Sequence, residues 1–231
     1  PAEKSKPVKD FFDGFNEVIL RLIDLIMLVA PYGVFALLAA LVVESPSLDL
    51  FRALGMYAMT LVIGLVVMGI FYLLLVKLFV KLKPKKFIEG IAPAQLLAFS
   101  TSSSAATLPV TMERVEEHLG VDEEVASFVL PIGATINMDG TSLYQAVAAV
   151  FIAQAFGMDL DMSTQLTIVM TATLASIGAA AVPGAGMVML VIVLAQAGIP
   201  EAGLALIFAI DRPLDMCRTV INITGDASVS L

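Results

Sequence analysis

The sequence predicts an all-α integral membrane protein, and three observations support this fold class. The 231 residues are 59% apolar and 15% charged, with a mean hydropathy of +0.95, whereas a soluble domain is usually about 45–50% apolar and about 25% charged. Residues 25–43 and 53–76 contain no charged side chain, and a spanning helix needs about 20 mostly apolar residues. Later apolar stretches are interrupted by Ser, Gly and Pro, a pattern typical of helices broken within a membrane.

The composition also excludes several classes of protein. There are 13 Lys and Arg against 21 Asp and Glu, a net charge of −8, which argues against a nucleic-acid partner. One Cys and one His exclude a disulfide framework and a His- or Cys-rich metal site. The chain begins at Pro1 and has no signal-peptide pattern, so we expect it to start partway through a longer protein.

Charges around the two apolar stretches predict how they are oriented. The segment between them, residues 44–50, is short and acidic, whereas lysines precede the first stretch and follow the second (Lys4, Lys6, Lys9, Lys77, Lys81, Lys83, Lys85 and Lys86). Because Lys and Arg favour the cytoplasmic side of a membrane, both basic clusters are expected there.

Two further apolar stretches are broken in their middle. The segments FSTSSSAATLPVT (99–111) and ATLASIGAAAVPGAGMVML (172–190) each predict two short helices separated by a turn of small residues and a Pro. A pair of interrupted apolar segments in corresponding halves indicates a transporter binding site. Two ordinary kinked spans are the alternative, because Pro and Gly are common in membrane helices.

The last segment, residues 202–229, carries a polar stripe. At 100° per residue its polar groups fall within an arc of about 100°, and we expect that arc to face the protein interior; the groups are Asp211, Asp215, Arg218, Thr219, Asn222 and Asp226. Arg212 lies at the edge of the stripe and is either a site residue or an anchor at the membrane interface, of which the anchor is favoured. Pro213 lacks a backbone donor and is expected to interrupt the helix.

Counting charges indicates a bound cation. The four acids Asp139, Asp211, Asp215 and Asp226 are opposed by only two arginines in these segments, and a buried net charge of −2 needs protons or cations. Amide oxygens of Asn137 and Asn222, together with carbonyls freed at broken turns, suit Na⁺.

The same residues outline an organic ligand. Arg218 offers a planar fork that can grip a carboxylate, and Asp215 can accept from an ammonium. Ser103 and Ser104 can present hydroxyls and helix N-terminal N–H groups to a second carboxylate. An amine flanked by two carboxylates is an acidic amino acid.

Four motifs resemble the dicarboxylate/amino acid:cation symporter family, the glutamate transporter family of archaea, bacteria and animals. They are SSSAATLP (102–109), GATINMDGT (133–141), ASIGAAAVPGAG (175–186) and DMCRTVINITGD (215–226). The resemblance covers essentially the whole chain and implies a glutamate-transporter fold with two re-entrant helical hairpins and an elevator-type transport core. It also implies a homotrimer in the cell membrane that takes up L-aspartate or L-glutamate with sodium.

The resemblance further implies an assignment of segments and of site residues. Residues 1–50 would be a scaffold helix, the family's fifth span, and residues 51–87 would be the sixth span and a basic cytoplasmic loop. Residues 88–120 would form the first hairpin, 121–158 the seventh span, 159–200 the second hairpin, acting as a gate, and 201–231 the eighth span. The family's first four helices would be absent from this chain. Implied substrate contacts are Ser103, Ser104, Thr141, Ala181, Val182, Pro183, Gly184, Asp215, Arg218, Thr219 and Asn222. Implied ligands of two or three Na⁺ sites, one incomplete in this chain, are Gly133, Thr135, Asn137, Met138, Asp139, Ser176, Ile177, Ala179, Asn222 and Asp226.

Other readings stay open at this point. A proton- or sodium-coupled carrier of C4-dicarboxylates or neutral amino acids is one; Asp215 argues against the former and Arg218 against the latter. An intramembrane aspartyl protease could use Asp139 and Asp226, but its Gly-x-Gly-Asp signature is absent. Ala181 replaces the glycine usual in the second hairpin tip of the family. Tyr57 and Tyr72 are interpreted as ordinary membrane-helix residues.

Overall fold

The structure, a computed structural model, describes residues 48–231 continuously and scattered positions between residues 6 and 43. The chain divides into two compact units, Pro1–Ser47 and Leu48–Leu231. In the first unit the described positions are helical. Only scattered positions of the expected span at 25–43 and of the scaffold segment 1–50 are described, so these expectations stay predictions.

The second unit is built from helices, and no strand occurs in its continuous stretch, which confirms the all-α class there. Its α-helices are α2 (Leu48–Leu75), α3 (Pro84–Thr101), α4 (Ser104–Arg114), α5 (Glu123–Ile136), α6 (Asp139–Ala155), α7 (Met162–Ile177), α8 (Ala185–Gln196) and α9 (Leu204–Val229). Single π-helical turns follow α2 at Val76–Val80 and α4 at Val115–Leu119, and a 3₁₀ turn, Glu201–Gly203, precedes α9.

The two broken segments fold back on themselves as helical hairpins. Helix α3 packs along α4 and α7 along α8, so ordinary kinked spans are not what the sequence forms. The first turn is tight because Ser102 takes a left-handed conformation, φ 54°, and Ser103 caps α4 by accepting from the Ala106 N–H at 3.1 Å. The second turn, residues 178–184, is longer and ends at Gly184 with φ 77°.

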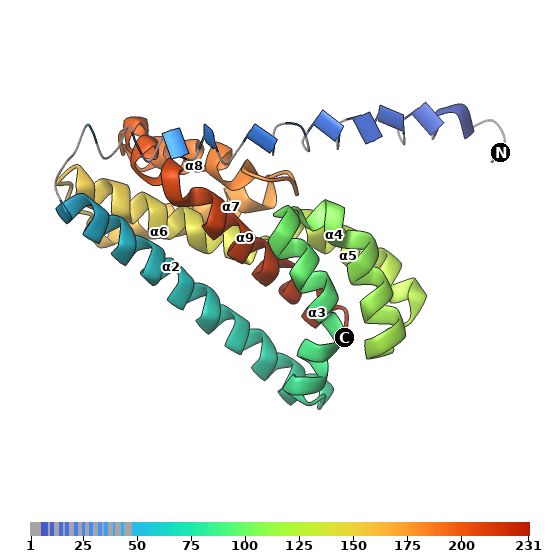
Figure 1. The fold of residues 1–231 in the computed structure, drawn as a ribbon. Helices are drawn as coiled ribbons and strands as arrows, with labels where there is room; N and C mark the ends of the chain where they lie inside the picture. Colours follow the sequence, from blue (N-terminus) through green and yellow to red (C-terminus); the bar gives the residue numbers. More distant parts are fainter. Residues whose placement is uncertain are drawn as a thin grey trace. The chain divides into compact units, whose positions relative to one another are not determined.

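Helix α9 runs through the middle of this unit (Figure 1). It packs against α2, α3, α4, α5 and α6, with α6 to α8 near its start and α3 to α5 near its end in the same view. The expectation that Pro213 interrupts this helix is wrong, because α9 is continuous from Leu204 to Val229. The neighbouring helices hold both halves in line, and the proline ring lies on the exposed side of α9.

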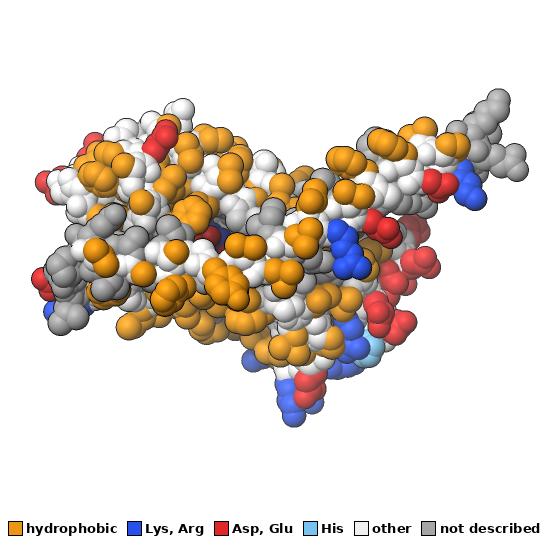
Figure 2. All heavy atoms as spheres, turned by 45° about the horizontal axis from the view of Figure 1, so that its top comes forward, with side chains coloured by type: hydrophobic (Ala, Val, Ile, Leu, Met, Phe, Trp, Pro, Cys, Tyr) orange, Lys and Arg blue, Asp and Glu red, His pale blue; other side chains and the backbone are white. Residues whose placement is uncertain are grey.

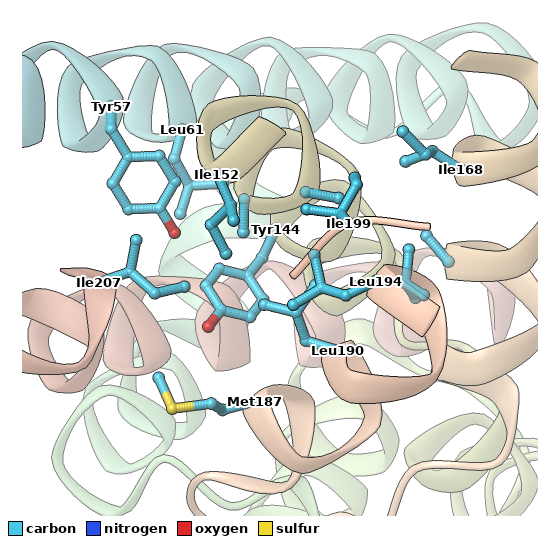
Figure 3. Close-up of a cluster of buried hydrophobic side chains, with 14 of the residues drawn as sticks. Tyr57, Leu61, Tyr144, Ile152, Ile168, Met187, Leu190, Leu194, Ile199 and Ile207 are labelled. Carbon is cyan, nitrogen blue, oxygen red and sulfur yellow. The ribbon is translucent and has the colours of Figure 1, made fainter. Parts of the chain in front are cut away.

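Apolar side chains join the first half of α9 to the second hairpin. Figure 3 shows Tyr57 and Leu61 of α2 directed toward Tyr144 of α6 and Ile207 of α9, with Leu190 of α8 below them. These side chains are almost fully buried. The core therefore fixes α6, α8 and α9 relative to one another, and these are helices that carry the polar residues described next.

The surface of the second unit is largely apolar. Phe51–Val80 is the one helix in the described part of the chain that is long and apolar enough to cross a membrane, in agreement with the predicted span at 53–76. Figure 2 shows hydrophobic side chains over much of the visible surface, with Lys and Arg side chains gathered at the lower end of the view. All five lysines from Lys77 to Lys86, where α2 leads into α3, are exposed.

Candidate functional site

The polar stripe of α9 is buried, as its periodicity predicted. Asp211, Asp215, Arg218, Thr219, Asn222 and Asp226 are each at most 8% exposed. On the other side of the helix Pro213 is exposed, and Cys217 and Ile221 are half-buried. The stripe divides into two groups of charges, one around Arg218 and one around Asp226.

The first group, the arginine cluster, contains two acids and two arginines. Arg218 Nη2 donates to Asp215 Oδ1 at 2.7 Å and lies 3.4 Å from Asp211 Oδ1. Arg212 Nη1 lies 3.6 Å from Asp215 Oδ2. Of the two roles open for Arg212, this contact supports that of a site residue, because its long side chain reaches the acid one turn away. With Arg212 included, the formal charges of this cluster cancel.

Arg218 keeps part of its hydrogen-bonding capacity unused. Its guanidinium stacks on the Tyr144 ring, 3.6 Å from the ring centroid. Within the described residues, Nε and Nη1 have no hydrogen-bond partner although both are buried. A Cβ at Gly186 would lie 3.2 Å from Nη1, so this glycine lets α8 approach the guanidinium. Two unpaired donors on a buried guanidinium are suited to a carboxylate.

The tips of the two hairpins meet beside this cluster. Ser103 Oγ donates to the Ala181 carbonyl at 2.7 Å, and the Gly184 N–H donates to Asp215 Oδ2 at 2.9 Å. Because Ala181 accepts this hydrogen bond through its main-chain carbonyl, the contact with Ser103 does not depend on the Ala181 side chain. Val182 is exposed, and Pro183 and Gly184 are half-buried.

A small cavity lies where the tips and α9 meet. It has a volume of about 20 Å³ and is lined by residues of both tips, of the α5–α6 break and of α9: Ser102, Ser104, Met138, Thr141, Ala180, Ala181, Val182, Ala185, Gly186, Asp215, Thr219 and Asn222. A cavity of this size holds about one water molecule. The structure thus brings nearly all the predicted substrate contacts together, in a closed arrangement.

The second group of charges, the acid pair, lies at the break between α5 and α6. Asn137 and Met138 leave the helical conformation there. Asn137 Nδ2 donates to Asp226 Oδ1 at 2.9 Å, and Asp139 Oδ2 accepts from the Tyr72 hydroxyl. A Cβ at Gly133 would lie 2.6 Å from Asp226 Oδ1, so only glycine lets α5 come this close. No Lys or Arg of the described residues pairs with either acid.

Asn222 connects the two groups. Its Oδ1 accepts from the Gly140 N–H at 2.8 Å, and its Nδ2 donates to Thr141 Oγ1 at 3.2 Å. A Cβ at Gly140 would lie 2.8 Å from the Arg218 carbonyl oxygen. The start of α6 is therefore held directly against α9 between the arginine cluster and the acid pair.

The other predicted cation ligands lie at two helix ends. Met138 and Ala179 pack together with Ala181, and Ala179 donates its N–H to the Ser176 carbonyl at 3.1 Å. The side chains of Thr135 and Ile177 are exposed. Among the described residues no group of three His, Cys, Asp or Glu side chains could hold a metal ion, so a cation here would depend on main-chain and amide oxygens as well as carboxylates.

The sequence interpretation missed two tyrosines and one further contact. Tyr72, interpreted as an ordinary membrane-helix residue, contacts Asp139, and Tyr144 supports Arg218. Gln145 Nε2 donates to the Gly186 carbonyl at 3.0 Å and ties α6 to the second hairpin. A buried tyrosine usually finds a partner for its hydroxyl, which is the signal that could have pointed to Tyr72.

The chain is similar to known proteins over nearly its whole length. Residues 2–231 match the model of the sodium:dicarboxylate symporter family. The chain is 48% identical over 227 residues to excitatory amino acid transporter 1 of Ambystoma tigrinum, covering 97% of this chain and 42% of that protein. It is 44% identical over 228 residues to excitatory amino acid transporter 2 of Homo sapiens, covering 98% and 40%.

A third relative, excitatory amino acid transporter 3 of Mus musculus, is 46% identical over 227 residues, covering 98% of this chain and 43% of that protein. The chain spans about two fifths of the length of these relatives. The family and these relatives are transport proteins, not enzymes. The chain belongs to the sodium:dicarboxylate symporter family.

Proposed function

We propose that the full-length protein is a sodium-coupled symporter that takes up acidic amino acids, L-aspartate or L-glutamate, across the cell membrane. The observation that carries this proposal is the buried guanidinium of Arg218, which has two donors without a partner among the described residues and lies against Asp215 beside the cavity. The family description and the names of the relatives point the same way.

The ligand would use the polar groups on both sides of the cavity. Arg218 would bind the side-chain carboxylate, Asp215 the ammonium group and Asn222 the main-chain carboxylate. Such a ligand places a negative group next to a buried cation and a positive group next to a buried anion. The remaining contacts would come from Ser103, Ser104, Thr141 and Thr219 and from the second tip, Ala181 to Gly184.

Ligand entry would require the hairpin tips to separate. A cavity of about 20 Å³ is far too small for an amino acid, and Asp215 already accepts from Gly184. Opening would break that hydrogen bond and the one from Ser103 to Ala181. The second hairpin would then act as a gate, and bound ligand would replace the lost tip contacts.

Sodium would be co-transported because the acid pair carries two charges without a partner of opposite sign. One Na⁺ site would use carbonyls of Gly133 and Asn137 with Asn222 and Asp226. A second would use carbonyls at the two helix ends described above, from Thr135, Met138, Ser176, Ile177 and Ala179. A third would involve Asn137 and Asp139, with its other ligands on a helix outside this chain.

The movement would follow the elevator scheme of the family. The hairpins would be re-entrant, entering the membrane without crossing it, and the core that holds the site would slide against a scaffold in a homotrimer. The supporting observation is that Ser103 and Ala181, the two residues through which the hairpin tips meet, are both buried. In this scheme the ligand stays with α9 while the core moves.

Calorimetric binding of L-aspartate to the purified full-length protein, in NaCl and in KCl, tests the proposal. We expect binding in NaCl alone and a loss of about 100-fold or more in Arg218→Ala, because hydrogen bonds to charged groups contribute about 1.5–3 kcal/mol each. Arg218→Lys, which keeps the charge and loses the fork, should also bind weakly, whereas Arg52→Ala removes an exposed arginine and should bind normally. Aspartate binding that is equal in both salts, or unchanged in Arg218→Ala, contradicts the proposal.

A further inference from the structure

Tyr72 is a buried tyrosine of α2 whose hydroxyl reaches the acid pair. Its side chain is 4% exposed, and its hydroxyl donates to Asp139 Oδ2, on the first residue of α6. Helix α2 is otherwise a mainly apolar span, so it contributes a polar contact at the point where two acids of other helices come together.

The neighbouring backbone is shaped to admit this hydroxyl. A Cβ at Gly225 would lie 2.8 Å from the Tyr72 hydroxyl oxygen and 2.8 Å from Asn137 Nδ2. Any larger residue at this position would push both donors away from the acids that they contact. Gly225 directly precedes Asp226, so α2, the α5–α6 break and α9 converge on one point.

The two donors divide the acids between them. Tyr72 donates to one oxygen of Asp139, and Asn137 donates to one oxygen of Asp226. The second oxygen of each carboxylate remains available to a cation. Hydrogen bonds of this kind fix the orientation of ligating groups, and their loss typically lowers metal affinity by about 10–100-fold.

We propose that Tyr72 is a positioning residue of the cation site, which holds Asp139 in the orientation that binds Na⁺ and thereby sets the affinity for the coupling ion. The inference rests on the proposed function, because it takes Asp139 as a ligand of one of the proposed sodium sites. A positioning role differs from a packing role in one respect, because the sodium affinity then depends on the hydroxyl of Tyr72 and not on its ring.

The experiment compares two conservative variants of the full-length protein. Tyr72→Phe removes the hydroxyl and keeps the ring. Tyr57→Phe is the matched control, because Tyr57 is also buried in α2 but its hydroxyl has no hydrogen-bond partner among the described residues. Two quantities are measured: the NaCl concentration that gives half of the thermal stabilisation without amino acid, and the affinity for L-aspartate at saturating NaCl.

We expect the half-saturating NaCl concentration to rise about tenfold in Tyr72→Phe and to change less than twofold in Tyr57→Phe. Aspartate affinity at saturating NaCl should change less than twofold in both. In an Asp139→Asn background, Tyr72→Phe should have no further effect on the NaCl dependence, because the hydroxyl acts through that carboxylate.

Three results would overturn the inference. The first is an unchanged NaCl dependence in Tyr72→Phe, the second an equal shift in both tyrosine variants, and the third an undiminished effect in the Asp139→Asn background. A wild-type protein that is neither stabilised by NaCl nor dependent on it for aspartate binding would overturn the proposed function as well. The two failures are therefore distinguishable.

Discussion

The arginine cluster and the acid pair lie along the same helix but are neutralised in different ways. In the arginine cluster, Asp211 and Asp215 are matched by Arg212 and Arg218 within 3.6 Å. In the acid pair, the described part of the chain offers Asp139 and Asp226 hydrogen bonds from neutral groups and no ion pair. A buried acid without a base favours a small mobile cation, whereas a balanced cluster with spare donors favours a ligand that carries both charges.

This difference explains why the two groups can be adjacent without merging. Asn222 and the start of α6 lie between them and offer neutral polar contacts to both sides. A ligand at the arginine cluster and a cation at the acid pair would then act on the same short stretch of backbone. Substitutions that change one group and spare the other test whether this separation is real.

The largest effect is expected for Asp226→Asn at the acid pair. It removes one of two unpaired charges and keeps the shape of the side chain. The NaCl concentration that gives half-maximal aspartate binding should therefore rise about 100-fold, which corresponds to about 2.7 kcal/mol. Calorimetric titration of L-aspartate at graded NaCl concentrations measures this effect. Glu89→Gln, which removes an exposed acid, is the control. A normal NaCl dependence in Asp226→Asn would show that this acid does not carry cation binding.

A smaller effect is expected for Arg212→Gln at the arginine cluster. Without Arg212 the cluster has a net negative charge, which disfavours a second carboxylate. The ratio of aspartate to asparagine affinity should fall about fivefold, because the partly exposed ion pair is weakened by solvent and is worth about 1 kcal/mol. Competition binding with the two amino acids gives this ratio directly, with Arg52→Gln as the control. If the ratio holds while both affinities fall, Arg212 supports the fold and not the selectivity.

The most local effect is expected for Ser103→Ala at the hairpin tip. It removes the bond to Ala181 and the cap of α4, each worth about 1 kcal/mol. The amide of Ala106, which donates to Ser103 Oγ, should exchange with deuterium several times faster, while the half-saturating NaCl concentration stays within twofold. Ser100→Ala, which removes an exposed hydroxyl, should change neither quantity. A shift in NaCl dependence as large as that in Asp226→Asn would mean that the two groups are not separate.

The sequence alone predicts those features of the fold that follow from a regular repeat within one segment. The 100° spacing placed Asp211, Asp215 and Asp226 on the buried side of α9, and the Ser-, Gly- and Pro-containing breaks located both hairpin turns. Burial follows from helix periodicity and from the cost of exposing charges to lipid. Both are properties of a single segment.

What the sequence could not provide are contacts between distant segments. Tyr72 and Asp139 are 67 positions apart, and no local pattern indicates that α2 passes over Gly225. Arg212 lies at the edge of the stripe, so the direction of its long side chain depends on its surroundings. Pro213 was expected to interrupt α9, but packing from the surrounding helices outweighs the loss of one backbone hydrogen bond.

The contact between the hairpin tips has a consequence for chain entropy. Ala181 is bound through its carbonyl, and in the continuous stretch from residue 48 it is not among the residues with positive φ. An alanine with compatible backbone angles has fewer accessible conformations than a glycine when the segment is released, so less entropy is lost when it is ordered again. Closing the tips is therefore easier with alanine at this position than with glycine, although the closed contact itself is the same.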